Sequence, residues 1–431
     1  MRRRHSTLLF TVLSSSFVSL QSQSAFTLLL MISVLQAEEI IISTVKDYGN
    51  ESVAFNEASG RILAENIYCD RDFPAFNRVS MDGIAIRFSG FEAGLRSFTI
   101  KGTQAAGDTP IELEGDDECI EIMTGASLPD SADTIIRYED IIIETGKATL
   151  LVNQLKKGQA IHYRAQDKRE GDLAAPAGIV VDAAVISVAA TIGKTNLLVK
   201  KLPKVCIIST GDELVDINAT PNPFQVRRSN SYTIREILNR YGVDVSVTHL
   251  PDNPSIIEQQ LDTYLKQYDV VLLSGGVSMG KYDYVPAALE KLLVQQLFHK
   301  VGQRPGKPLW FGKHHSGSLV FAFPGNPVSA FLCMYRYFIP WLEASLQMRK
   351  KPLLHAVLGE DVTFTPALQY FMQVKAAINE QGKLIAMPNH GNGSGDLANL
   401  IDTNAFLELP SERDHFIKGE VFPLWVFKNI F

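Results

Sequence analysis

The sequence predicts a multidomain protein that combines a doubly wound parallel α/β domain with β-rich modules. A chain of 431 residues is too long for one core, since single cores stop growing at roughly 250–300 residues. Between residues 203 and 345, short apolar runs alternate with helical patterns, which is typical of a parallel sheet covered on both faces. On either side of this segment, short apolar runs separated by turn residues indicate β-rich modules.

Composition and charge narrow the functional class. The formal net charge of -6 argues against a general nucleic-acid binder, which would carry a basic excess. A negative net charge does not argue against small anionic ligands, because salt screens exposed charges beyond about 8 Å. The charges near a binding site therefore decide what it binds.

The four cysteines, Cys69, Cys119, Cys206 and Cys333, are scattered without a C-x-x-C pair. We therefore expect free thiols in the reducing cytoplasm and no structural zinc site.

Residues 1–30 are predicted to be a removable leader or the product of a misassigned start. Arginines at positions 2–4 precede an apolar stretch that resembles a secretory signal, and each apolar run is too short for a membrane span. The competing interpretation is a wrong start codon, because Ser33 and Gln36 have capping-box spacing directly after Met31. We expect the folded protein to begin at Met31 and not to bind a membrane.

Two domains are predicted before residue 203. A helical pattern covers 33–44, and 183–192 indicates a second helix. Between them, strands are expected at 97–101, 118–123, 134–138, 141–144 and 148–152. We therefore expect an elongated linker domain made of 31–78 and 166–202, with a β-rich domain inserted at 79–165.

The segment 203–350 gives the predicted α/β domain. Strands at 204–208, 243–248 and 269–273 alternate with helices at 231–241, 254–268 and 284–294. Ligands of such sheets bind outside the carboxyl ends of the strands. A last β-rich domain is expected at 351–431, with strands at 355–358, 370–378, 383–387, 405–409 and 421–427.

Two polar loops follow predicted strands of the α/β domain. The first contains Ser209, Thr210, Gly211 and Glu213, which suit a phosphate or metal site but are equally compatible with an ordinary polar turn. The second contains Ser274, Gly275, Gly276 and Ser278 before a helix start, where backbone N–H groups form an anion cradle. Asp283 stands at that helix start, either as a capping carboxylate or as a group that holds a metal against phosphate.

Two further loops indicate anion binding. Lys300, Arg304 and Lys307 place three cations within eight residues broken by Gly and Pro, which favours a phosphate or oxyanion site over a solvated helix face. Pro324 and Pro327 hold a rigid turn before a long apolar helix. Either the free N–H groups at the start of this helix face a ligand, or the turn only initiates the helix.

Six motifs in this order resemble the MoeA family, which includes the carboxy-terminal domain of gephyrin. They are Ser-Met-Asp-Gly at 80–83, Met-Thr-Gly-Ala at 123–126, Ser-Thr-Gly-Asp-Glu-Leu at 209–214, Ser-Gly-Gly-Val-Ser at 274–278, Pro-Gly-Lys-Pro at 305–308 and Pro-Gly-Asn-Pro-Val-Ser-Ala at 324–330. Each motif is weak alone, whereas six in sequence are specific. The resemblance covers about 31–431.

The resemblance implies an elongated four-domain subunit with a MogA-like α/β domain. It also implies a homodimer whose active site lies between subunits. The implied enzyme is a molybdopterin molybdenumtransferase, which takes adenylylated molybdopterin and molybdate, needs Mg²⁺, and yields molybdenum cofactor and AMP. Molybdopterin adenylyltransferase and cofactor-free molybdoenzymes are the implied partners.

Residue roles also follow from the resemblance. Asp82, Thr124 and Asp167 are expected to reach the partner's pocket. The residues expected to act in catalysis are Asp82, Thr124, Glu213, Asp252 and Asp283. Glu213, Asp252 and Asp283 are expected to surround the pterin phosphate and the metal. Lys300, Arg304 and Lys307 should hold molybdate or phosphate, with Ser394 on the oxyanion side.

Several positions depart from the family pattern. Ile84 stands where tyrosine is common, and Arg304 stands where lysine is common, which keeps the charge but forbids a lysine-type pKa shift. The stretch 162–167 is less basic than usual, and the glycine-rich stretch around Ser394 is altered. Two alternatives stay open: a molybdopterin adenylyltransferase-like enzyme, which would usually have about half this length, and a non-catalytic scaffold like gephyrin.

Overall fold

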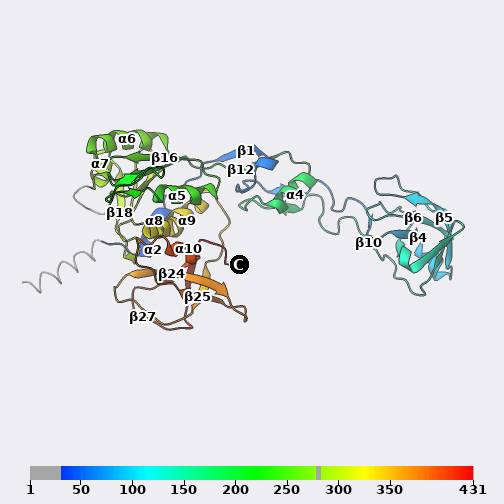
Figure 1. Cartoon of the computed structure of the whole chain (residues 1–431). Helices are drawn as coiled ribbons and strands as arrows, with labels where there is room; N and C mark the ends of the chain where they lie inside the picture. The colour runs from blue at the N-terminus through cyan, green and yellow to red at the C-terminus, as the bar shows by residue number, and fades with distance from the viewer. Residues whose placement is uncertain (1–30, 278–282, 431) are drawn as a thin grey trace, which may run out of the picture.

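The computed structural model describes residues 31–277 and 283–430 and has an elongated shape (Figure 1). The α/β domain and the C-terminal β domain lie together at one end, the inserted β module forms the other end, and a narrow linker joins them. The predicted leader at 1–30 and the predicted site residue Ser278 lie outside the described residues. Within the described ranges, no helix is both long enough and apolar enough to cross a bilayer.

The α/β domain is built on a six-stranded sheet with the order β16-β13-β17-β21-β20-β18. Its strands are β13 (Val205–Thr210), β16 (Val245–Leu250), β17 (Val270–Ser274), β18 (Gln295–His299), β20 (Trp310–Lys313) and β21 (Leu319–Phe323). Alternate residues enter different cores, with Ile207 on one face of the sheet and Ile208 on the other. Both faces are therefore buried, as the apolar strands predict.

Helices cover both faces of this sheet. They are α5 (Asn230–Asn239), α6 (Pro254–Gln267), α7 (Val285–Lys291), α8 (Pro327–Cys333), the π-helical turn η3 (Met334–Phe338) and α9 (Ile339–Ser345). The α6 side chains Ile257, Leu261 and Leu265 pack on one face, at the spacing of one helical stripe. Asn253 caps α6 through its side chain, and Pro254 follows at the first helical turn.

The edge of the sheet differs from a wholly parallel arrangement. The strands β16, β13, β17 and β21 are parallel, whereas β20 and β18 run antiparallel to their neighbours. Only five residues separate β20 from β21, and a parallel pair needs a crossover of a dozen residues or more. The short connection therefore forces a hairpin.

The linker contains short paired strands and two helices. These elements are α2 (Val34–Ile42), β1 (Asn50–Ala54), η1 (Phe55–Glu57), β2 (Ile67–Tyr68), β3 (Arg78–Val79), β10 (Ile161–His162), β11 (Leu173–Ala175), α4 (Ala183–Thr191) and β12 (Asn196–Lys200). The predicted capping box is present, since Ser33 and Gln36 exchange side-chain-to-backbone hydrogen bonds at the start of α2. The apolar face of α2 belongs to the main hydrophobic cluster of the α/β domain, which Ile62 also joins.

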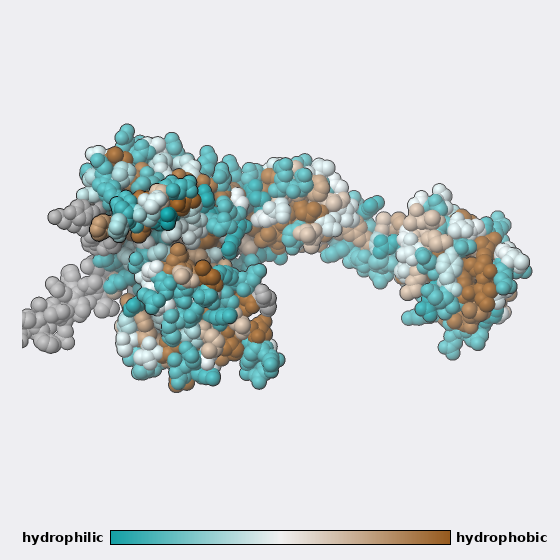
Figure 2. All heavy atoms as spheres, viewed as in Figure 1, coloured by the Kyte–Doolittle hydropathy of each residue, from teal (hydrophilic) through white to brown (hydrophobic). Residues whose placement is uncertain are grey.

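The inserted module contains a six-stranded sheet with the order β7-β4-β6-β5-β9-β8. Its elements are β4 (Gly83–Ile86), α3 (Phe88–Glu92), β5 (Ser97–Gln104), β6 (Glu118–Ile122), β7 (Thr134–Arg137), η2 (Tyr138–Asp140), β8 (Ile141–Glu144) and β9 (Lys147–Leu150). It has hydrophobic clusters of its own. Its surface also carries an apolar band (Figure 2), and its exposed apolar side chains include Ile142 and Leu151.

The C-terminal domain is a small closed barrel. Its sheet has the order β19-β24-β25-β22-β28-β26, and an additional β24–β26 pairing closes it. The main strands are β22 (Leu354–Leu358), β24 (Gln369–Ile378), β25 (Leu384–Pro388), β26 (Ala405–Leu409) and β28 (Val421–Val426); smaller elements are β23 (Val362–Thr363), α10 (Asn399–Asp402) and β27 (His415–Phe416). The strand β19 (Gln303–Arg304) comes from the α/β domain and pairs with β24, so the loop with the predicted cations joins the two domains.

Candidate functional site

Four carboxylates line one pocket at the carboxyl ends of the parallel strands. The pocket has a volume of about 650 Å³, and its carboxylates are Asp212, Glu213, Asp252 and Asp283. Asp212 and Glu213 follow β13, Asp252 follows β16, and Asp283 precedes α7. The small paired strands β14 (Leu214–Val215) and β15 (Val226–Arg227) support the first of these loops. Strand order therefore brings together three loops that are far apart in the sequence.

The carboxylate pocket also contains glycine backbone and an unsatisfied hydroxyl. Gly275 and Gly276 line it with φ values of +96° and +69°, and a Cβ on Gly276 would meet Thr210 Oγ1 at 2.7 Å. Thr210 is 3% exposed, and its Oγ1 has no hydrogen-bond partner among the described residues. A buried hydroxyl without a partner is costly, which favours a ligand that would satisfy it.

Negative charge is concentrated in this pocket. Burial raises the pKa of the Asp252 carboxyl, and the carboxylates of Asp212, Glu213 and Asp283 raise it further. The Asp212 backbone N–H, 3.4 Å from Asp252 Oδ2, acts in the opposite direction. No lysine or arginine is among the described residues that line the pocket. The pocket therefore favours a cation.

The raised pKa of Asp252 gives a prediction about stability. The pKa of Asp252 is higher in the folded than in the unfolded protein, so at a pH above the folded-state pKa its ionisation destabilises the fold. At a pH below the unfolded-state pKa the group is protonated in both states and has no such effect. Asp252→Asn should therefore raise the melting temperature near pH 7 in metal-free buffer. The difference should disappear below about pH 4, near the ordinary pKa of aspartate. Thermal melting of both proteins across this range checks the prediction, and an unchanged or lower melting temperature at pH 7 would contradict it.

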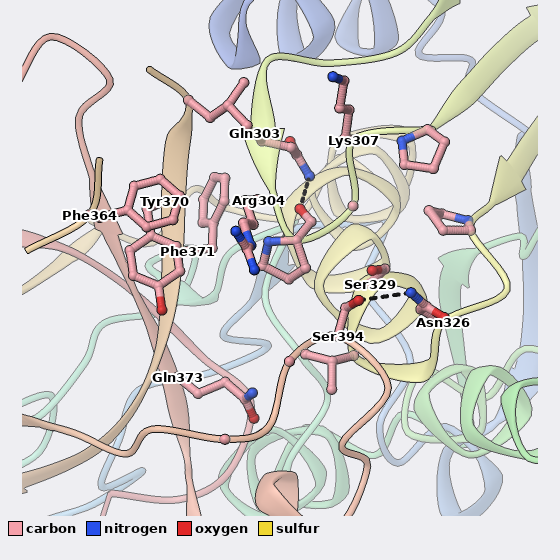
Figure 3. A pocket seen from close by; sticks show the side chains of 18 of the residues that line it. Gln303, Arg304, Lys307, Asn326, Ser329, Phe364, Tyr370, Phe371, Gln373 and Ser394 are labelled. Atoms are coloured by element: carbon pink, nitrogen blue, oxygen red, sulfur yellow. Dashed lines mark hydrogen bonds between the residues drawn. The ribbon is translucent and has the colours of Figure 1, made fainter. Parts of the chain in front are cut away.

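A second cavity, of about 580 Å³, opens between the α/β domain and the C-terminal barrel (Figure 3). We call it the cationic cavity, because Arg304 and Lys307 line it. The Arg304 guanidinium lies near its centre, with Phe364 and Tyr370 on one side and Ser394 on the other. The rings of Phe364 and Tyr370 stack with their centroids 4.0 Å apart, and Arg304 lies 5.9 Å from the Phe364 centroid.

Hydroxyl and amide groups complete the cationic cavity. Asn326 Nδ2 donates to Ser394 Oγ at 2.8 Å, and the Val328 backbone N–H donates to the Ser394 carbonyl at 3.1 Å. Ser329 also lines the cavity, together with Gln373, whose Oε1 is buried without a partner among the described residues. Two cations with convergent hydroxyl and amide donors suit an oxyanion.

One loop separates the two cavities. Pro324 and Asn326 line the cationic cavity, whereas Gly325 lines the carboxylate pocket. Asn230 Nδ2 donates to the Gly325 carbonyl at 2.8 Å and to Ser274 Oγ at 2.9 Å. These hydrogen bonds connect the loop to the glycine-rich segment at 274–276. A ligand with two chemically different ends could cross the loop and occupy both cavities.

The structure divides the predicted site residues among several places. Thr210, Gly211, Glu213, Asp252, Gly275, Gly276 and Asp283 share the carboxylate pocket, and Arg304, Lys307, Pro324 and Ser394 share the cationic cavity. Four other predicted residues line neither cavity. Ser209 is buried, and its hydroxyl lies within 3.3 Å of His249 and Thr248. The Ser274 hydroxyl accepts a hydrogen bond from Asn230. Lys300 lies at the base of its loop beside Ile32, and Pro327 is the first residue of α8.

Asp82, Thr124 and Asp167 lie away from both cavities. The Thr124 backbone N–H donates to Asp82 Oδ1 at 2.6 Å, which lowers the pKa of Asp82. Asp82 and Thr124 belong to the inserted module, which the linker separates from the α/β domain (Figure 1). Asp167 is 2.9 Å from His162 Nε2, where the module joins the linker.

Sequence reasoning missed most of the cationic cavity. Asn326 and Ser329 stand inside a motif that was recognised, and a hydroxyl near a helix start is a usable signal. Phe364, Tyr370 and Gln373 come from the C-terminal domain, where no motif marks them. Only the pairing of β19 with β24 brings them to the cations.

Three family models match successive parts of the chain. The MoeA N-terminal region (domain I and II) matches residues 32–193, a probable molybdopterin binding domain matches 206–344, and the MoeA C-terminal region (domain IV) matches 355–427. Together they account for most of the described chain.

Whole-length relatives show the same similarity. A molybdopterin molybdenumtransferase from Synechocystis sp. is 36% identical over 398 residues, which cover 92% of this chain and 100% of that protein. The enzyme of that name from Haemophilus influenzae is 29% identical over 397 residues, covering 91% and 96%. A crystal structure of a molybdopterin biosynthesis MoeA protein from Pyrococcus horikoshii gives a TM-score of 0.77 at 27% identity, covering 93% and 100%.

Proposed function

Because the chain belongs to the MoeA family, we propose that it is a molybdopterin molybdenumtransferase that inserts molybdate into adenylylated molybdopterin and releases AMP. The observation that carries this proposal is the pair of cavities of opposite charge on the two sides of Pro324–Asn326. Molybdate is an oxyanion, which needs hydrogen-bond donors and positive charge around it. Adenylylated molybdopterin contains a phosphoanhydride, whose cleavage needs a metal ion held by carboxylates.

The cationic cavity is the proposed molybdate site. Arg304 and Lys307 supply positive charge, and Ser394 and Ser329 supply hydroxyl donors. A fully ionised tetrahedral oxyanion only accepts hydrogen bonds, so a cavity rich in donors suits it. Neighbouring Phe364 and Tyr370 present aromatic surface, which suits a planar pterin.

The carboxylate pocket is the proposed site of the phosphoanhydride and of Mg²⁺. Its residues fit this ion because four carboxylates line the pocket, and three of them raise the pKa of the fourth, Asp252. Across the described residues, no group of three or more His, Cys, Asp or Glu side chains could hold a metal ion by itself. That agrees with Mg²⁺, which is usually bound by one or two carboxylates together with substrate phosphates. Glu213, Asp252 and Asp283 would surround it, with one or two of them as direct ligands and phosphate oxygens as the others. When bound, the ion would neutralise charge on the anhydride as that bond breaks.

A homodimer completes the proposed site. Asp82 and Thr124 lie at the far end of the molecule from both cavities of their own chain, as Figure 1 shows for their module. We therefore assign them to the pocket of the partner subunit in a symmetric dimer. We also propose a cytoplasmic location, which the four free and buried cysteines support.

Complementation between two inactive variants tests this dimer. Asp82→Asn and Asp283→Asn should each be inactive alone. A heterodimer purified through two different tags should regain about half of the native activity, since one of its two sites combines an intact module with an intact pocket. The measurement is AMP release per dimer. An inactive heterodimer would contradict the shared site and would indicate that Asp82 and Asp283 act within one chain.

Activation of a cofactor-free molybdoenzyme tests the proposed reaction. The protein is incubated with adenylylated molybdopterin, Mg²⁺ and molybdate, and the acceptor enzyme is then added. We expect acceptor activity only when molybdate is present. Pterin binding without acceptor activation would exclude the insertase and favour a scaffold.

A further inference from the structure

The loop with the predicted cations folds around one buried amide. Gln303 is 0% exposed, and its Nε2 donates to the Pro305 carbonyl at 3.0 Å (Figure 3). Further along, the Val301 backbone N–H donates to the Lys307 carbonyl at 2.9 Å. These two hydrogen bonds close the loop on itself between Val301 and Lys307. The closed segment carries Arg304 and Lys307, the two cations that line the cationic cavity.

The π-helical turn η3 holds the other side of this amide. The Tyr337 hydroxyl donates to Gln303 Oε1, and Tyr337 is 1% exposed. This hydrogen bond sets which end of the amide faces the loop, because a reversed amide would direct Oε1 at the Pro305 carbonyl oxygen. Burial raises the pKa of Tyr337 well above its usual range, so the hydroxyl stays protonated and can donate.

The loop packs closely against its neighbours. Gly306 has φ +90°, and a Cβ there would lie 2.6 Å from Gln303 Nε2 and 2.9 Å from Cys333 Sγ. The neighbour of Tyr337, Arg336, is 2% exposed and anchors the turn through Glu38 at 2.7 Å and Glu408 at 3.7 Å. The turn is thus fixed between α2 and the barrel, and it transmits that fixed position to the loop.

We propose that Gln303 and Tyr337 form a positioning pair that holds the Arg304–Lys307 loop in the geometry that binds the oxyanion. The inference rests on the proposed function and adds two residues that act through the loop. Gln303 lines the cationic cavity, but its amide is engaged by the Pro305 carbonyl and the Tyr337 hydroxyl, and Tyr337 is not among the residues that line the cavity. Like charges on one short loop repel each other, so a loop without an internal restraint would spread its cations. A restraint formed before binding lowers the ordering cost of binding.

Three variants test the pair. Tyr337→Phe removes only the hydroxyl, Gln303→Met removes both amide hydrogen bonds at similar volume, and the double variant removes both partners. We expect each single variant to raise the KM for molybdate by about tenfold, the typical loss for one buried hydrogen bond. The kcat at saturating molybdate and the KM for the pterin substrate should change less than about twofold. The double variant should resemble Gln303→Met, because both residues act through one contact.

Tyr335→Phe is the matched control. It removes a hydroxyl from the same turn, but that hydroxyl lies 3.5 Å from Arg240 and not at the loop. We expect its KM for molybdate to equal that of the native protein. A structural role alone would lower the melting temperature or kcat in the variants without a selective change in the KM for molybdate.

The outcomes separate this inference from the proposed function. If the native protein shows no molybdate-dependent AMP release, the proposed function fails and the positioning role fails with it. If the native protein is active and Tyr337→Phe keeps the native KM for molybdate, the positioning pair alone is overturned. Should Gln303→Met fail to fold, Tyr337→Phe still decides the question, since it keeps the aromatic ring.

Discussion

Asp283→Asn should lower the rate of AMP release on the order of 10²–10³-fold while leaving the fold intact, which is the typical loss for one group that stabilises a charged transition state electrostatically. Asp283 lines the carboxylate pocket and contributes to the raised pKa of Asp252. Asparagine keeps the shape of the side chain and removes its charge. The proposed Mg²⁺ site would then lose one of its three predicted carboxylates.

Steady-state AMP release at saturating Mg²⁺ measures this effect. Glu290→Gln is a suitable control, because Glu290 is an exposed carboxylate on α7, the helix that Asp283 precedes, and does not line the pocket. The control should keep native activity. If Asp283→Asn retains native turnover, Asp283 has no role in the metal or phosphate site and is only a carboxylate near a helix start.

Lys307→Ala should weaken molybdate binding by roughly 10- to 100-fold, the range expected for one charge-assisted hydrogen bond of about 1.5–3 kcal/mol. Lys307 lines the cationic cavity and is partly buried, so water screens its charge less than that of an exposed lysine. In Figure 3 its side chain points away from Arg304. A flexible stem would let the ammonium turn toward a bound anion.

Calorimetric titration of molybdate separates binding from turnover for this variant. Lys313→Ala is the matched control, because Lys313 is an exposed cation at the end of β20 and lines neither cavity. Lys307→Arg should keep part of the affinity, since the charge is retained. Native molybdate affinity in Lys307→Ala would remove this residue from the oxyanion site.

Local signals predicted part of the secondary structure. In the α/β sheet they indicated β13, β16 and β17 but not β18, β20 and β21. The capping box at Ser33 and Gln36 is present, and the predicted helix at 254–268 corresponds to α6, Pro254–Gln267. The predicted helix at 284–294 ends earlier, at Lys291, because Leu293 takes a left-handed conformation with φ +57° before β18 begins. Nothing in the residue types around Leu293 indicates that turn.

Convergence between domains was the harder part to predict. Lys300, Arg304 and Lys307 look equivalent in the sequence, yet the loop turns around Gln303 and leaves Lys300 at its base. Gln303 itself carries no motif, and its role depends on Tyr337, 34 residues away. Such contacts depend on packing between separate elements, which no short sequence pattern encodes.

The carboxylate pocket was more predictable, because strand order alone assembles it. Glu213, Asp252 and Asp283 follow or precede elements of one doubly wound sheet, whose strand ends meet at one edge. Buried polar residues on the same strands were less predictable. Ser209 stands in the recognised motif, but it lies against His249 and Thr248 instead of opening to the pocket.

The proposed site couples cleavage of the phosphoanhydride to molybdenum insertion. A single-turnover reaction with adenylylated molybdopterin and Mg²⁺ tests it most directly, with AMP and pterin-bound molybdenum measured in the same sample. We predict that both appear together in equal amounts, and only when molybdate is added. AMP release at the same rate without molybdate, or without molybdenum in the pterin product, would contradict the claim.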